Sequence, residues 1–136
     1  MNILKDIKKH EGFKPTVYEE TEGYDTIGDG FAIKDLYLSK GVAELILREK
    51  LNNLTLTIGK KFEWFDNSPD PIKDAVTNMC YQMGVAGFSK FKKTIYYLET
   101  EQYEEASTEC LDSLWAKQTP HRAKEVSEAI SSAVAD

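Results

Sequence analysis

The 136-residue chain has 41% apolar and 29% charged residues, a composition typical of one globular domain with a hydrophobic core. Its net charge of −6 argues against non-specific binding to nucleic acid or anionic membranes, because phosphate binding needs clustered cations. No apolar run is long enough to cross a bilayer, and the first twelve residues lack the apolar segment of a secretory signal. We therefore expect a protein that stays in the cytoplasm unless something else releases it. Two cysteines, Cys80 and Cys110, give no disulfide framework and predict buried free thiols.

The N-terminal third predicts a short helix followed by a small antiparallel sheet. Apolar residues follow helical spacing from Ile3 to Ile7, and Gly12 is placed to end a helix over residues 1–11. β-branched and aromatic residues separated by glycines then occupy residues 13–38. This residue pattern is typical of a hairpin or a three-stranded meander.

The rest of the chain predicts helices. Apolar residues fall near one stripe over residues 39–58, which indicates a long helix with Ser39 as its N-cap. Further stripes separated by turn residues predict a mostly helical lobe over residues 59–136. The expected fold is α+β, one domain over residues 1–136. In it the long helix joins a small β lobe to a helical lobe that includes the N-terminal helix.

An acidic segment near the N-terminus is the strongest functional signal. The stretch from His10 to Gly30 holds six carboxylates and four glycines in twenty-one residues. A solvated loop, a metal site and a pair of catalytic carboxylates are the open interpretations. A calcium site using Glu22, Asp25 and Asp29 is disfavoured, because the EF-hand spacing and its bidentate glutamate are absent. We expect no metal and no cofactor.

Two of these carboxylates could perform acid–base chemistry. Glu11 lies where the helix gives way to the sheet, and burial there would favour the protonated form that a general acid needs. Glu20, partly solvated, would stay ionised as a general base, and Thr26 on the returning strand could hold a water. Such a pair is the usual equipment for cleaving a glycosidic bond. For any single acid, a surface hairpin that simply carries charge remains the alternative.

An ordered set of motifs extends from this segment to the C-terminal region. They are Glu11-Gly12, Tyr18, Thr21-Glu22-Gly23-Tyr24, Thr26-Ile27-Gly28, Gly30, Asn78-Met79, Gln82-Met83-Gly84, Val85-Ala86-Gly87-Phe88, Trp115, Gln118-Thr119-Pro120 and Arg122-Ala123-Lys124. In this order they closely resemble the T-even phage lysozymes, glycoside hydrolase family 24. The resemblance implies two lobes with a cleft between them. It also implies hydrolysis of the β-1,4 bond between N-acetylmuramic acid and N-acetylglucosamine in bacterial peptidoglycan.

The resemblance also implies a cellular setting for the protein. Relatives of this type accumulate in the host cytoplasm and reach the cell wall through a separate membrane pore. We accordingly expect an endolysin that is monomeric, with peptidoglycan as its partner, no nucleic-acid partner and no stable membrane association.

The resemblance assigns roles by position. Glu11 matches the general acid, Glu20 the second acid and Thr26 the threonine that holds the attacking water. Arg122 matches an arginine expected to pair with Glu11. Four further positions match residues expected to bind the substrate: Glu22, Ala32, Tyr81 and Gln82.

The sequence departs from the family at chemically important positions. Glu20 replaces the usual aspartate, and misplacing a catalytic group by about 1 Å can cost on the order of a hundredfold in rate. Asp25 is the substitute base if Glu20 does not serve. Asp29 adds an acid where relatives usually place an apolar or aromatic residue. These changes motivate an alternative function, a catalytically weak or inactive lysozyme-fold protein that binds peptidoglycan or a protein partner.

Overall fold

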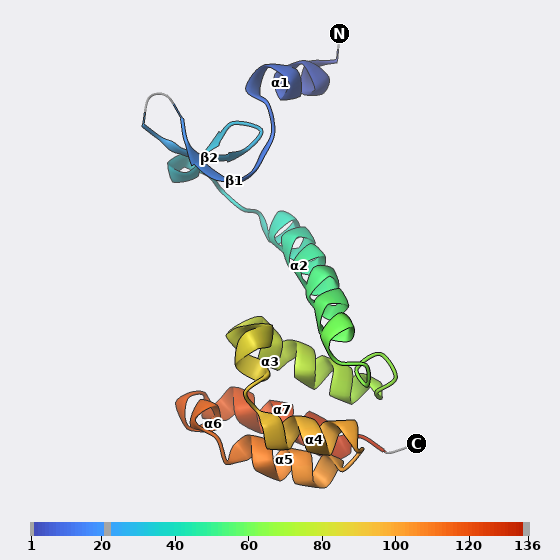
Figure 1. Ribbon diagram of the computed structural model, residues 1–136. Coiled ribbons are helices and arrows are strands. Elements are labelled where there is room, and N and C mark those ends of the chain that lie inside the picture. The colour runs from blue at the N-terminus through green and yellow to red at the C-terminus, as the bar shows by residue number, and fades with distance from the viewer. Residues whose placement is uncertain (1, 21–22, 135–136) are drawn as a thin grey trace. The chain divides into compact units, whose positions relative to one another are not determined.

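The computed structural model describes residues 2–20 and 23–134, which divide into two compact units (Figure 1). Unit 1 is Met1–Glu44 and contains a small sheet, whereas unit 2 is Leu45–Asp136 and is helical. The predicted α+β fold class is therefore confirmed.

Before the start of the long helix, the described residues of unit 1 form a short helix, three strands and a 3-10 turn. Its elements are α1 (Ile3–Glu11), β1 (Lys14–Glu19), β2 (Asp25–Gly28), β3 (Phe31–Ala32) and η1 (Ile33–Asp35). The strands form one antiparallel sheet in the order β1-β2-β3, which confirms the predicted meander. The central strand β2 consequently has a neighbour on each side.

The helix α1 has a cap at each end. The Asn2 side chain accepts a hydrogen bond from the Lys5 backbone N–H at 3.2 Å, which satisfies one of the helix's free N-terminal donors. At the other end Gly12 adopts a φ of +72° and donates its N–H to the Lys8 carbonyl. A positive φ is easily reached by glycine, so the sequence ends the helix directly after Glu11.

The long helix α2 (Lys40–Lys61) crosses the boundary between the two units. The Ser39 hydroxyl accepts a hydrogen bond from the Val42 backbone N–H at 3.2 Å, so the predicted N-cap is confirmed. The helix extends three residues beyond the predicted end at residue 58. Ile58, near its C-terminal end, is its buried residue.

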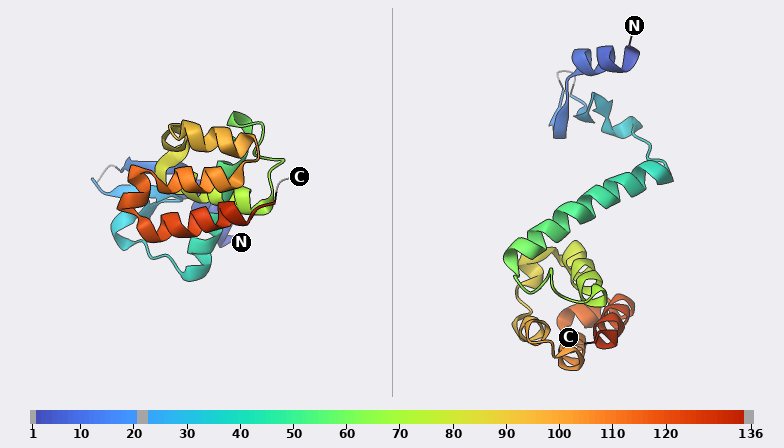
Figure 2. Two further views of the ribbon diagram at one scale, coloured as in Figure 1. Left: turned by 90° about the horizontal axis from the view of Figure 1, so that it is seen from below. Right: turned by 90° about the vertical axis from the view of Figure 1, so that its right-hand side faces the viewer.

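Unit 2 is a cluster of helices around one hydrophobic core. Its further helices are α3 (Asp70–Phe88), α4 (Lys92–Glu99), α5 (Tyr103–Leu111), α6 (Leu114–Gln118) and α7 (Pro120–Ser132). The helices α4, α5 and α7 run side by side, with α5 packed against both of the others (Figures 1 and 2). The largest fully buried side chains are Phe65, Phe88, Ile58, Ile72, Met79, Leu98 and Ile130. Burying each such side chain contributes about 1.5–3 kcal/mol, so this core holds unit 2 together.

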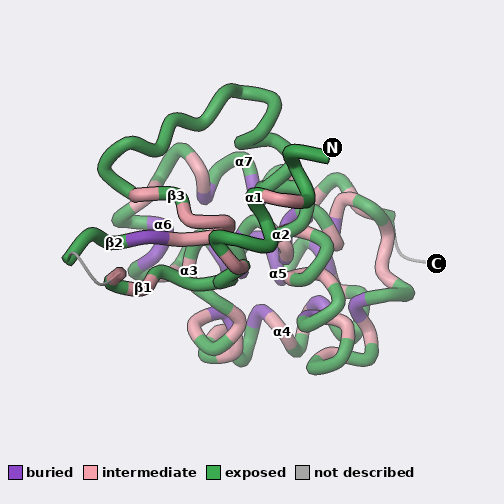
Figure 3. Tube along the Cα trace, turned by 90° about the horizontal axis from the view of Figure 1, so that it is seen from above, coloured by how far each residue is buried: buried purple, intermediate pink, exposed green. Residues whose placement is uncertain are grey.

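Buried residues are distributed unevenly along the chain (Figure 3). They concentrate in α3 to α7, whereas no residue of α1 is buried. In the described part of unit 1, Thr26 is the buried residue, with 5% of its surface exposed. The sheet is therefore built around the position that the sequence marks as a candidate catalytic residue.

The two cysteines are free and buried, as predicted. Burial raises the pKa of the Cys80 and Cys110 thiols from 9.0 to about 12, because an apolar environment disfavours the charged thiolate. Both thiols therefore stay protonated at neutral pH and act as small apolar side chains in the core. No helix within the described residues is both long and apolar enough to span a membrane.

Candidate active site

One face of the sheet collects Thr26 and two of its neighbours. Thr26 on β2 pairs with Tyr18 on β1 and with Ala32 on β3. Directly opposed residues in an antiparallel sheet point to the same face. Tyr18, Thr26 and Ala32 thus form a row across the sheet, and Ala32, a predicted substrate position, lies beside the predicted water-holding residue.

Glu20 shares this face, whereas Asp25 does not. Glu19 pairs with Asp25, and the Glu20 backbone N–H donates to the Tyr24 carbonyl at 3.0 Å, so the pairing continues past the end of β1. Because successive strand residues point to opposite faces, Glu19 and Asp25 face away from Thr26. The register therefore argues against Asp25 as a substitute base, and Glu20 remains the candidate.

The backbone of Tyr24 links Glu20 to Thr26. Its carbonyl accepts one hydrogen bond from the Glu20 backbone N–H and another from the Thr26 hydroxyl, both at 3.0 Å. Its N–H donates to Glu20 Oε1 at 3.4 Å. The turn is closed by Gly23, with a φ of +89°, whose N–H donates to the Glu20 carbonyl. The Glu20 carboxylate is thereby directed toward the backbone N–H of Tyr24.

The bonding of Thr26 determines what its hydroxyl can still do. The hydroxyl proton goes to the Tyr24 carbonyl, and a hydroxyl oxygen carries two acceptor lone pairs. Toward a water molecule, Thr26 in this arrangement acts as an acceptor. It can hold one water proton while leaving a lone pair on the water oxygen to face an electrophile.

Glu11 lies against the turn between β2 and β3. A Cβ atom built on Gly30 would lie 2.5 Å from Glu11 Oε2 and 3.0 Å from Glu11 Cδ, so the carboxyl packs directly on the glycine. Gly30 also has a φ of +85°, which an L side chain rarely adopts. Glu11 is exposed within its own unit. The predicted burial of Glu11 at a junction between the two lobes involves both units and stays a prediction.

The contacts of Glu11 and Glu20 are at opposite ends of β2. Glu20 is held by Tyr24, the residue before the strand, and Glu11 packs on Gly30, two residues after it. A strand of four residues is about 10 Å long. Thr26, near the start of the strand, lies between the two contacts.

Arg122 is held by α3. Its Nε donates to Asn78 Oδ1 at 2.7 Å and its Nη2 donates to the Asn78 carbonyl at 3.2 Å. Arg122 and Tyr81 both line a pocket of about 730 Å³ in unit 2. The pairing of Arg122 with Glu11 joins the two units and stays a prediction. The anchoring role of Asn78 was missed in the sequence, although its motif was recognised.

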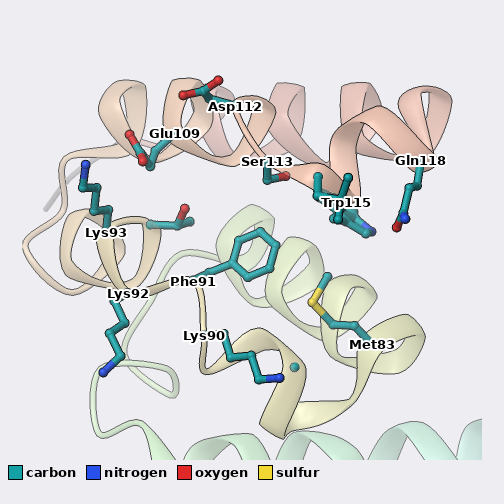
Figure 4. A pocket seen from close by; sticks show the side chains of 13 residues that line it. Met83, Lys90, Phe91, Lys92, Lys93, Glu109, Asp112, Ser113, Trp115 and Gln118 are labelled. Carbon is teal, nitrogen blue, oxygen red and sulfur yellow. The ribbon is translucent and has the colours of Figure 1, made fainter.

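Gln82 is hydrogen-bonded to a residue that lines a second pocket of unit 2. Its Oε1 accepts a hydrogen bond from Trp115 Nε1 at 2.8 Å, and Trp115 lines a cavity of about 580 Å³. Met83 and Phe91 also line this cavity (Figure 4). Its charged lining residues are Lys90, Lys92, Lys93, Glu109 and Asp112. No sequence pattern indicated this pocket, because its lining comes from two separate stretches of the chain, residues 83–94 and 109–118.

The remaining candidate, Glu22, lies outside the described residues. Across residues 2–20 and 23–134, no group of three or more His, Cys, Asp or Glu side chains is arranged to hold a metal ion. In unit 1, Glu11, Glu20 and Thr26 supply two carboxyl groups and a hydroxyl, which suit proton transfer to and from a bound water.

Comparison with known proteins gives a consistent result. The family model described as phage lysozyme matches residues 8–130. Two proteins of Dictyostelium discoideum named probable T4-type lysozymes 1 and 2 are 29% and 32% identical to the chain, and each match covers 93% of this chain and 92% of the relative. The pre-baseplate central spike protein Gp5 of Enterobacteria phage T4 is 29% identical over 93% of this chain, which corresponds to 27% of that protein.

Replacing Gly30 with alanine should displace the Glu11 carboxyl. The new methyl group would occupy its place, and the positive φ should lower the free energy of unfolding by about 1–2 kcal/mol. Gly84→Ala is the matched control, since Gly84 has a φ of +78° and open space around its Cβ position. Chemical denaturation should show similar losses for both variants. Only Gly30→Ala should shift the carboxyl ¹³C resonance of Glu11, and an unchanged resonance would contradict the contact.

Proposed function

The chain belongs to the phage lysozyme family, and from that premise we propose that it hydrolyses the β-1,4 bond between N-acetylmuramic acid and N-acetylglucosamine in bacterial peptidoglycan. The observation that carries the proposal is the shared attachment of Glu20 and Thr26 to the Tyr24 backbone, with Glu11 at the far end of β2. This arrangement suits an inverting acid–base mechanism.

In the proposed reaction a water molecule replaces the leaving sugar directly. Glu11 donates its proton to the glycosidic oxygen as the bond from this oxygen to the anomeric carbon breaks. Glu20 accepts a proton from the water, whose oxygen forms the new bond on the opposite face of the sugar ring. The products are two saccharide ends, and the two carboxyl groups exchange protonation states.

The bonding around Tyr24 supports the roles of Glu20 and Thr26. A water between these residues would donate one hydrogen bond to the Glu20 carboxylate and a second hydrogen bond to the Thr26 hydroxyl oxygen. Both residues act as acceptors here, so the lone pair of the water oxygen is directed away from the protein. A carboxylate can accept several hydrogen bonds at once, and the bond from the Tyr24 N–H is therefore compatible with this role.

The length of β2 supports the assignment of Glu11 as general acid and Glu20 as general base. An inverting glycosidase needs its carboxyls roughly 6.5–9.5 Å apart to accommodate the water. The two contacts flank β2, a strand about 10 Å long, so the two carboxyls are held apart with Thr26 between their contacts, as an inverting mechanism requires. The folded-back position of Glu20 also offers a way to take up the extra methylene relative to aspartate.

The unit 2 candidates would bind the substrate rather than carry out the chemistry. Tyr81 and Gln82 follow one another on α3. Tyr81 lines one pocket, and Gln82 accepts a hydrogen bond from Trp115, which lines the other. We propose that they contact sugars or peptide stems, as Ala32 and Glu22 would from unit 1. Arg122, held in place by Asn78, would support Glu11 from α7.

We further propose that the protein is an endolysin that acts on the wall after release from the host cytoplasm. The support is its resemblance to lysozymes that depend on a separate membrane pore. Expression inside bacteria tests this placement. Lysis should require a co-expressed pore-forming membrane protein, and prompt lysis without one would contradict it.

Substitution of the two acids tests the reaction itself. Glu11→Gln and Glu20→Gln should each lower the clearing of outer-membrane-permeabilised bacteria by at least about a hundredfold, because each removes a proton-transfer group. Glu19→Gln is the matched control. Glu19 neighbours Glu20 but faces away from Thr26, so this variant should clear cells like the unmodified protein.

The same assay separates the two functions considered from the sequence. Clearing by the unmodified protein that disappears in Glu11→Gln supports hydrolysis. Binding to purified walls without any release of reducing sugar would support the inactive binding protein and contradict the proposed reaction.

A further inference from the structure

The last turn of α1 and the turn between β2 and β3 meet at two adjacent contacts. Lys8 Nζ lies 3.4 Å from Asp29 Oδ2, and one residue further along the same turn Glu11 packs on Gly30. Lys8 and Glu11 are three residues apart, so they lie on the same face of the helix. That face is therefore held against the turn by one charged contact and one steric contact.

Apolar burial within unit 1 does not fix this helix. None of the residues of α1 is buried, whereas the sheet beside it has a buried centre at Thr26. Where the last turn of α1 lies relative to the sheet must then depend strongly on its polar contacts and on the short connection through Gly12. The ion pair between Lys8 and Asp29 is such a contact.

Asp29 is not an ordinary solvated surface acid. Its side chain is 20% exposed, and its Oδ1 atom is buried without a hydrogen-bond partner in the described structure. A carboxylate with one oxygen in that position depends on its counter-charge, because removing the partner leaves a poorly solvated charge. Lys8, whose side chain is 55% exposed, supplies that charge at the other oxygen.

We propose that Lys8 and Asp29 form a positioning pair that holds the Glu11 carboxyl over the β2–β3 turn and so sets its separation from Glu20. The inference rests on the proposed function, in which Glu11 is the general acid. Neither member of the pair touches the reacting atoms, and both act through Glu11. A shift of about 1 Å in a catalytic group can cost on the order of a hundredfold in rate, so loss of the pair should lower turnover.

The test removes each charge with little change of shape. Lys8→Met and Asp29→Asn should each lower kcat by about tenfold or more while KM changes less than about twofold, since ground-state binding is not affected. The double variant should be no slower than the slower single variant, because the two residues act as one unit. Lys8→Arg keeps the charge and should retain most of the activity.

The matched control is Lys9→Met, the same substitution one residue further along α1. It should leave kcat unchanged, and a loss equal to that of Lys8→Met would overturn the proposal. Additive losses in the double variant would also overturn it. If the unmodified protein shows no turnover, the proposed function fails, but the pair is still tested by the carboxyl ¹³C resonance of Glu11. Lys8→Met should shift that resonance and Lys9→Met should not, and equal resonances would exclude a positioning role.

Discussion

The candidate site depends on the backbone N–H and carbonyl of one residue, Tyr24. The Tyr24 carbonyl accepts hydrogen bonds from the Glu20 backbone N–H and the Thr26 hydroxyl, and the Tyr24 N–H donates to the Glu20 carboxylate. Three short-range hydrogen bonds therefore fix two side chains that would otherwise rotate freely on a small sheet. Because the hydroxyl donates to the protein, the only role left to Thr26 toward a water is that of acceptor. The chemistry proposed for the site follows from this choice of donor.

The second constraint is the close approach of Glu11 to Gly30. A glycine is required there both by its positive φ and by the space that the carboxyl occupies. The turn thus gives a helix-borne acid a defined place beside a strand that carries the other two groups. The pleat of the sheet also places the acidic residues of this segment on two opposite faces. Glu19 and Asp25 face one side, and Glu20 faces the other.

The sequence patterns predicted the local elements well and the contacts between them poorly. The meander, the Ser39 cap and the free thiols depend on residues close together in sequence, and all three are confirmed. The rejection of Asp25 as a base needed the strand register, which composition alone does not specify. The Lys8–Asp29 pair joins residues twenty-one positions apart and was not predicted. In the sequence, Asp29 was considered only as a calcium ligand and as an added acid where relatives usually place an apolar or aromatic residue.

In unit 2, too, the sequence predicted the helices but not the contacts between residues far apart in the chain. Its helices follow apolar stripes and turn residues that are visible in the sequence, and its core contains the predicted buried cysteines. The anchoring of Arg122 by Asn78 and of Gln82 by Trp115 links positions 44 and 33 residues apart. Both links join motifs that the resemblance to phage lysozymes had already singled out. In each case the family motif identified the residue and the structure supplied its contact.

The stereochemistry of the product tests the central claim most directly. If Glu20 and Thr26 activate a water that attacks the sugar carbon itself, then cleavage of a defined β-1,4-linked muropeptide oligomer should first yield the α-anomer at the new reducing end. Proton NMR at early times, before the anomers interconvert, distinguishes the two products. Initial formation of the β-anomer would require two successive displacements at that carbon and would contradict the account.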